Sequence, residues 1–157
     1  MLIDLPFGPC EVHRSGTGVP VLMVHGALVN HTLWDRIVPG LEPVADLIRP
    51  DLPIGAHRTA VTHRDRLHPE AIADALVGVL DALEIDQAVV MGNDSGGALS
   101  QTMTARHPDR VRGLGLTSWD ALPHLPPTII KGLRPTTAIP GRARLPRPPP
   151  PAKTRRR

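Results

Sequence analysis

The sequence contains no tyrosine, one phenylalanine and two tryptophans, and Cys10 is its single cysteine. One cysteine excludes an internal disulfide and a cysteine-based zinc site, and it is compatible with a reducing cytoplasm, the location we expect. The chain has no run of apolar residues long enough for a membrane span. Its first residues also lack the basic and then apolar pattern of a secretory signal.

Acidic residues are absent from residues 131–157, which carry nine lysines and arginines and many prolines. Residues 1–130 carry nine arginines and all fifteen acids, so the net charge of +3 hides a split between −6 and +9. The segment 131–157 has too few apolar residues to offset the entropy of ordering, which predicts a disordered tail. We therefore expect one domain over residues 1–130.

Apolar residues in 1–130 follow strand and helix patterns in alternation. Strand patterns lie within 11–18, 20–24, 44–49, 87–91 and 111–116, and helical patterns lie at 31–41, 69–84 and 95–107. Such alternation is typical of the α/β class, in which helices connect parallel strands. We predict a mostly parallel sheet of about six strands with three major helices.

The segment Gly92-Asn-Asp-Ser-Gly-Gly97 lies between an apolar strand pattern and a helical one. A sharp turn of small residues between strand and helix holds its apex side chain exposed, as in a nucleophile elbow. Glycines two positions before and after Asp94 place this aspartate at the apex. A carboxylate nucleophile forms an ester intermediate, as with carbon–halogen or epoxide electrophiles. Asp94 could instead cap the helix, since aspartate is a favoured N-cap.

A second loop, His25-Gly26-Ala27, follows another apolar strand pattern. Its backbone N–H groups and that of Ser95 could converge on a developing oxyanion. His25 itself fits a structural role within this loop, and an ordinary strand-to-helix turn is the alternative for the loop as a whole.

These two loops, with the segment 106–111 after the elbow helix, resemble the α/β-hydrolase superfamily over about residues 8–130. The aspartate resembles the haloalkane dehalogenase and epoxide hydrolase branch, in which a histidine activates water to hydrolyse the ester. Dehalogenases of this branch have a tryptophan after the nucleophile and an asparagine in the oxyanion loop, where this chain has Ser95 and Ala27. Epoxide hydrolases activate their substrate with tyrosines, and this chain has none.

Asp120 follows the strand pattern 111–116. The resemblance implies that Asp120 is the acid that orients the catalytic histidine, and the alternative is a solvated aspartate in a turn. The family's histidine comes from a loop after the last strand, and the match fades near Lys131. We therefore expect an incomplete α/β-hydrolase core without its cap, last strands or histidine, as an altered reading frame would produce. His124 is a weaker substitute base, and His13, His57, His63, His68 and His107 are interpreted as surface or turn residues.

The expected function is hydrolysis of a small organic substrate, of the epoxide, halide or ester class, through Asp94, in a chain that is impaired or inactive. No cofactor, metal ion, membrane or specific nucleic acid is implied as a partner. One alternative is a serine esterase that uses Ser95. Another is a non-catalytic binding protein whose basic tail contacts phosphates, or whose Pro148–Pro151 run docks in an aromatic groove.

Overall fold

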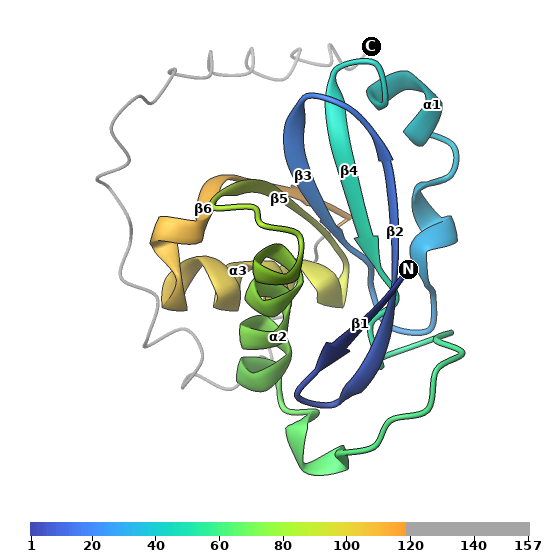
Figure 1. Ribbon diagram of the computed structural model, residues 1–157, viewed down its shortest axis with the longest axis vertical. Coiled ribbons are helices and arrows are strands. Elements are labelled where there is room, and N and C mark those ends of the chain that lie inside the picture. Colours follow the sequence, from blue (N-terminus) through green and yellow to red (C-terminus); the bar gives the residue numbers. More distant parts are fainter. Residues whose placement is uncertain (119–157) are drawn as a thin grey trace, which may run out of the picture.

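The computed structural model describes residues 1–118, which form a six-stranded sheet (Figure 1). The order across the sheet is β1-β2-β4-β3-β5-β6. The strands β3, β4, β5 and β6 are parallel, whereas β1 and β2 pair antiparallel. The bounds are β1 Leu2–Leu5, β2 Gly8–Gly16, β3 Val19–Val24, β4 Ala45–Pro50, β5 Ala88–Asn93 and β6 Val111–Thr117. The α/β class and the mostly parallel sheet are thereby confirmed.

The expected helix over residues 31–41 is wrong as a continuous element. The structure has a 3₁₀ helix at His31–Trp34 and a separate one-turn helix, α1, at Val38–Leu41. Pro39 explains the break, since proline has no N–H to donate and its ring clashes with a preceding helical turn. In the first turn of α1 the missing N–H costs nothing, so the proline starts the second helix.

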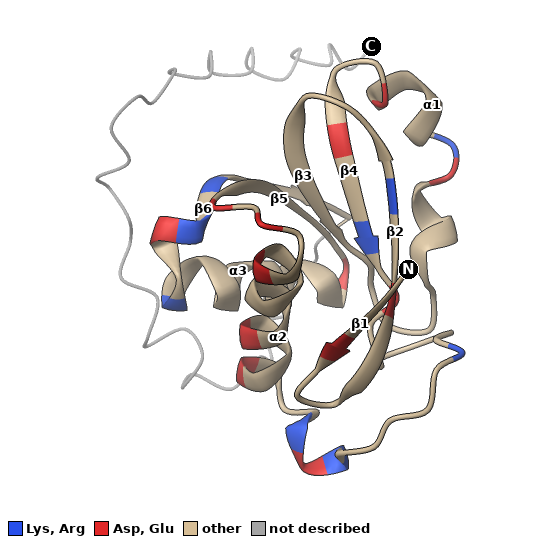
Figure 2. Cartoon of the chain, in the orientation of Figure 1, with Lys and Arg blue, Asp and Glu red and all other residues tan. Residues whose placement is uncertain are grey.

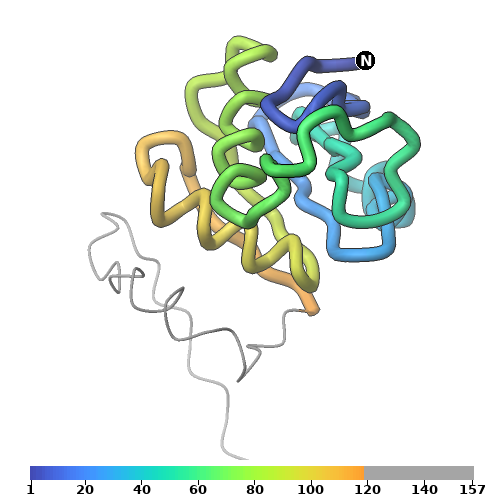
Figure 3. The backbone as a smooth tube through the Cα atoms, turned by 90° about the horizontal axis from the view of Figure 1, so that it is seen from below, coloured from blue at the N-terminus to red at the C-terminus, as the bar shows by residue number. Residues whose placement is uncertain are grey.

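Both faces of the sheet are covered, because alternate residues of the central strands point to opposite sides. Leu22, Val24 and Ile48 join the core beneath α2 (Pro69–Ala82) and α3 (Ser95–Arg106). Met23 and Leu47 instead pack with Trp34 and Val38 on the other face. The list of elements is completed by the 3₁₀ turns Arg64–Arg66 and Pro108–Arg110. Figure 3 shows α2 and α3 running side by side over the sheet.

Acidic residues lie along α2 (Figure 2), and one charged cluster joins α2 to Arg106 at the end of α3. Arg106 donates to both oxygens of Asp74, at 2.9 and 2.8 Å, and the His107 Nε2 atom lies 2.7 Å from Asp74 Oδ1. The pKa of Asp74 is lowered, first by the hydrogen bond from Arg106. Because these groups are partly exposed, the cluster positions the helices more than it stabilises them.

The strand β6 lies at one edge of the sheet formed by residues 1–118, and Leu114 on it is 40% exposed. The expected boundary at residue 130, the tail 131–157 and the residues Asp120 and His124 lie outside the described residues. Within residues 1–118, no helix is both long enough and apolar enough to cross a membrane.

Candidate active site

The elbow after β5 is the most unusual piece of backbone at the carboxyl edge of the sheet. Asp94 has φ 50° and ψ −126°, a conformation that L-residues adopt only under constraint. Its side chain makes no capping hydrogen bond to the helix that follows, so the interpretation of Asp94 as a side-chain N-cap is wrong. The exposed carboxylate has one side-chain donor within the described residues, the Ser95 hydroxyl at 3.3 Å.

Two flanking glycines are explained by close packing of the turn. A Cβ on Gly92 would lie 2.5 Å from Ser100 Oγ and 2.7 Å from the Gly97 Cα atom. A Cβ on Gly96 would lie 2.3 Å from the Val24 carbonyl oxygen. Any larger residue at either position would push β3, β5 and α3 apart, so the glycines allow the sharp turn that presents Asp94.

The loop after β3 lies directly against this turn. A Cβ on Gly26 would lie 2.8 Å from Asp94 Oδ2, so only glycine leaves the carboxylate room. The backbone N–H of Ala27 donates to Ser95 Oγ at 2.7 Å. The structure therefore brings together Gly26, Ala27, Asp94 and Ser95. In this arrangement the Ala27 N–H is engaged by the serine hydroxyl, which an oxyanion would have to displace.

His25 is fully buried, and the hydrogen bonds of its ring fix the loop that contains Gly26 and Ala27. Its Nδ1 atom lies 2.8 Å from the Gly26 carbonyl oxygen, and its Nε2 atom accepts from the Leu52 N–H at 2.8 Å. These two bonds fix the tautomer, with the proton on Nδ1. Burial lowers the pKa of His25, partly offset by the bond to Gly26. Both ring nitrogens are thus occupied in positioning the loop.

The end of β6 anchors the other side of the elbow. Asn93 donates through Nδ2 to the Thr117 carbonyl and hydroxyl oxygens, both at 3.2 Å. The Asp94 N–H donates to the same Thr117 carbonyl at 3.3 Å. Sequence reasoning missed this anchor, although a polar residue at the end of each neighbouring strand could have indicated it.

Several histidines interpreted as surface or turn residues have defined partners. The His68 side chain accepts from the Ala71 N–H and caps α2, and His107 contacts Asp74. His13 is only partly exposed and stacks on His31, a residue to which the sequence analysis gave no role.

A hollow of about 900 Å³ lies at the opposite edge of the sheet, where Gln87 precedes β5. Most of its lining residues are polar, Glu84 and Arg110 among them, and it contains none of the candidate site residues. The candidate site residues lie at the elbow and not in this hollow.

A parallel sheet with a strained strand-turn-helix elbow, faced by a glycine loop from the neighbouring strand, defines an α/β protein of the hydrolase type. The model of the alpha/beta hydrolase fold matches residues 19–135. The chain belongs to this family.

Named relatives agree with the family. A 2-hydroxymuconate semialdehyde hydrolase of Pseudomonas sp. (strain CF600) is 37% identical over 109 residues, which are 68% of this chain and 38% of the relative. A haloalkane dehalogenase of Mesorhizobium japonicum (strain LMG 29417 / CECT 9101 / MAFF 303099) is 33% identical over 103 residues, which are 66% of this chain and 33% of the dehalogenase. The chain therefore spans less than two fifths of the length of these relatives.

Solved structures give the same result. The N-acyl homoserine lactonase AidH superposes with a TM-score of 0.70 at 33% identity, covering 76% of this chain and 44% of AidH. The meta-cleavage product hydrolase CumD superposes with a TM-score of 0.65 at 26% identity, and the superposition covers 73% of this chain and 43% of CumD. The relatives are hydrolases that act on different small molecules, so the reaction class is shared more widely than the substrate.

Proposed function

We propose that this chain carries the nucleophile of a hydrolase that attacks small organic substrates through Asp94. The observation that carries the proposal is the backbone of Asp94, strained at φ 50° and ψ −126° while its side chain caps nothing. Strain of this kind persists only where surrounding structure enforces it, and it is concentrated at functional sites.

In the proposed first step, a carboxylate oxygen of Asp94 attacks an electrophilic carbon of an alkyl halide or epoxide. A new carbon–oxygen bond forms, and the bond to the halogen or epoxide oxygen breaks with its electron pair on the leaving atom. The product is an alkyl ester on Asp94. The Ser95 hydroxyl would orient the carboxylate, since it donates a hydrogen bond to Asp94 Oδ2 at 3.3 Å.

Hydrolysis of the ester needs a base for water. Among residues 1–118, no histidine forms a hydrogen bond or ion pair with Asp94. His124 is the one histidine outside those residues, and Asp120 lies nearby in the sequence as the acid that could orient it. We propose that the ester forms faster than it is hydrolysed and therefore accumulates, because no histidine among residues 1–118 is hydrogen-bonded to Asp94.

Mass spectrometry tests this proposal. After incubation with a reactive alkyl bromide or a small epoxide, the peptide that contains Asp94 should gain the mass of one alkyl group. The adduct should be absent in Asp94→Asn and present in Ser95→Ala. Alkylation that persists in Asp94→Asn, or that is spread over several carboxylates, would contradict the proposal.

The second candidate is a serine esterase that uses Ser95. It is favoured by the position of Ser95 Oγ between the Ala27 N–H and the Asp94 carboxylate. Turnover of an activated ester such as p-nitrophenyl acetate that survives Asp94→Asn and is lost in Ser95→Ala would establish it. Loss of turnover in both variants, with an alkyl adduct on Asp94, would reject it.

A further inference from the structure

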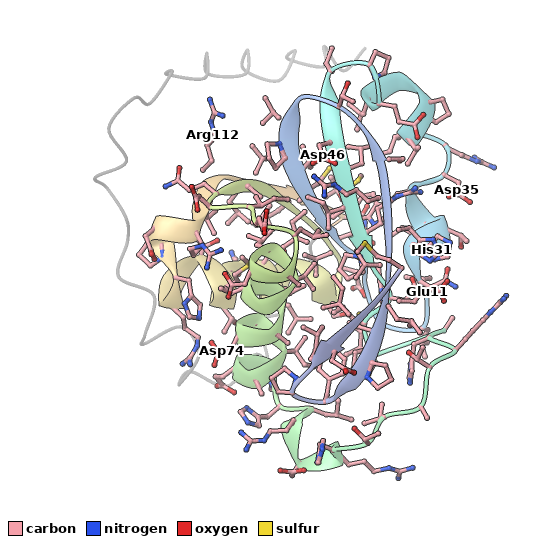
Figure 4. The ribbon with its side chains drawn as sticks, in the orientation of Figure 1. Glu11, His31, Asp35, Asp46, Asp74 and Arg112 are labelled. Atoms are coloured by element: carbon pink, nitrogen blue, oxygen red, sulfur yellow. The ribbon has the colours of Figure 1, made fainter. Side chains whose placement is uncertain are left out.

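Outside the elbow, the carboxyl edge of β4 holds a second group of chemically capable side chains. Asp51 directly follows β4, His13 lies on β2 and His31 begins the 3₁₀ helix after the glycine loop. One ligand atom from each of these three residues lies within 4.8 Å of the others. Glu11, also on β2, has its Oε1 atom 3.4 Å from His13 Nε2, and Figure 4 labels Glu11 and His31 in this region.

We propose that His13, His31, Asp51 and Glu11 form a binding site for one Zn²⁺ ion or a similar divalent transition-metal ion. Two imidazoles and two carboxylates match the ligands that zinc takes in proteins. Magnesium and calcium prefer oxygen ligands alone, so the histidines select against them. The proposal is independent of the function proposed for Asp94.

The separations between ligand atoms suit a tetrahedral ion. Ligand atoms at about 2.0–2.1 Å from a tetrahedral ion are roughly 3.3 Å from one another. His31 Nδ1 lies 2.9 Å from Asp51 Oδ1, and His13 Nε2 lies 3.4 Å from Glu11 Oε1 and 3.8 Å from Asp51 Oδ2. These three separations are close to the required value, and a turn of the His13 ring would be needed to direct all four ligand atoms at one ion.

A buried polar atom without a partner points to the same place. The Nε2 atom of His13 is buried and has no hydrogen-bond partner among residues 1–118, although two carboxylates lie within 4 Å of it. A buried polar nitrogen of this kind is costly unless something binds it. A cation between His13 and the carboxylates would satisfy it.

The two histidine rings define the movement that an ion would require. They stack with centroids 3.5 Å apart and an angle of 22° between their planes. A metal ion lies close to the plane of each imidazole that binds it, so one ring must turn out of the stack before both nitrogens reach the same ion. His13 is the ring that can turn, because its Nε2 atom makes no hydrogen bond to any other described residue.

Backbone hydrogen bonds hold the proposed ligands in place. The backbone N–H of His31 donates to Asp51 Oδ1 at 2.7 Å, and Asp51 is 3% exposed. The next residue, Leu52, donates its N–H to His25 in the glycine loop. An ion here would therefore tie β2, β4 and the segment 25–31 together, next to the Ala27 N–H that faces the elbow.

Titration of the full chain with Co²⁺ tests the site, because tetrahedral Co²⁺ absorbs strongly in the visible range. One equivalent should produce this absorption, and Zn²⁺ should abolish it by displacement. His13→Gln and His31→Gln should each weaken binding by ~10-fold or more, since even outer-sphere partners cost 10–100-fold. His63→Gln, which changes an exposed histidine outside the cluster, should bind as the wild type does.

Urea unfolding gives a second readout. Zn²⁺ should raise the unfolding midpoint of the wild type and of His63→Gln, and it should leave that of His13→Gln unchanged. His13 is the safer variant because its ring is partly exposed and its Nε2 atom makes no hydrogen bond within the described part of the chain. Absence of a tetrahedral spectrum, or equal binding by the wild type and His13→Gln, would overturn the proposal and leave the cluster as a histidine–aspartate hydrogen-bonded anchor.

Discussion

Replacing Asp94 by glycine should stabilise the protein while removing its proposed nucleophile. At φ 50° and ψ −126° an aspartate pays for a conformation that glycine adopts without a steric penalty. The carboxylate contributes little in exchange, because among the described residues its only side-chain partner is the Ser95 hydroxyl at 3.3 Å. The function proposed for Asp94 would therefore be in conflict with stability at the elbow.

The size of the effect follows from two opposing contributions. A residue held in a sparsely populated region of φ and ψ costs about 1–3 kcal/mol. A new glycine adds flexibility to the unfolded chain and lowers stability by about 0.5–1 kcal/mol. The net gain in the free energy of unfolding for Asp94→Gly should therefore be about 0–2.5 kcal/mol, with a central value of about 1 kcal/mol. Asp94→Ala retains the strain and should change stability by less than about 0.5 kcal/mol.

Urea unfolding of the full chain measures this difference, with an unchanged slope required for the comparison. Ala98→Gly is the matched control, because it adds a glycine four residues later in the regular helix α3. The control should lose about 1 kcal/mol. If Asp94→Gly were no more stable than Asp94→Ala, the conformation would carry no strain and the structural argument for the elbow would fail.

Two further perturbations separate close packing and burial from the elbow strain. Gly92→Ala should destabilise the protein by about 1–3 kcal/mol in urea unfolding, since the new Cβ would lie 2.5 Å from Ser100 Oγ. A Cβ at Gly40 would have no described atom within 4 Å, so Gly40→Ala should be neutral or stabilising by up to about 1 kcal/mol. Equal effects would refute the packing argument. Burial lowers the pKa of His25 below 6.5, so the unfolded chain binds more protons; stability should be full above about pH 6.5 and fall as the pH decreases below it. The fall should be shallower in His25→Gln, and an identical slope would show that His25 is not buried in its neutral form.

Elements with a strong period could be predicted from the sequence, and those set by one residue or by pairing could not. The apolar face of α2 and the strand β5 were predicted close to their observed bounds. The strand β1 was not named, although Ile3 and Leu5 alternate with exposed residues, because four residues give too short a pattern. The helix predicted over 31–41 is broken because of Pro39. The apolar spacing around this proline favours one continuous helix, so the spacing alone led to the wrong prediction.

For the candidate site, the spacing favours Asp94 at the apex, because it has glycines two positions away on both sides, whereas Ser95 has a glycine only two positions after it. What the Ser95 side chain contacts could not be predicted, since its partner Ala27 lies in a different loop and is brought near only by the pairing of β3 with β5. The same holds for His13, His31 and Asp51. They come from three separate segments whose contact depends on β2 pairing with β4.

The carboxyl edge of the sheet connects both proposals physically. His25 joins the glycine loop to Leu52, and Asp51 beside it holds His31 at the far end of that loop. The loop in turn contributes the Ala27 N–H that contacts Ser95 at the elbow. A metal ion at Asp51 would restrict the loop without touching the nucleophile. Alkylation of Asp94 measured with and without Zn²⁺ would therefore reveal coupling as a change in rate, while the identity of the alkylated residue stays the same.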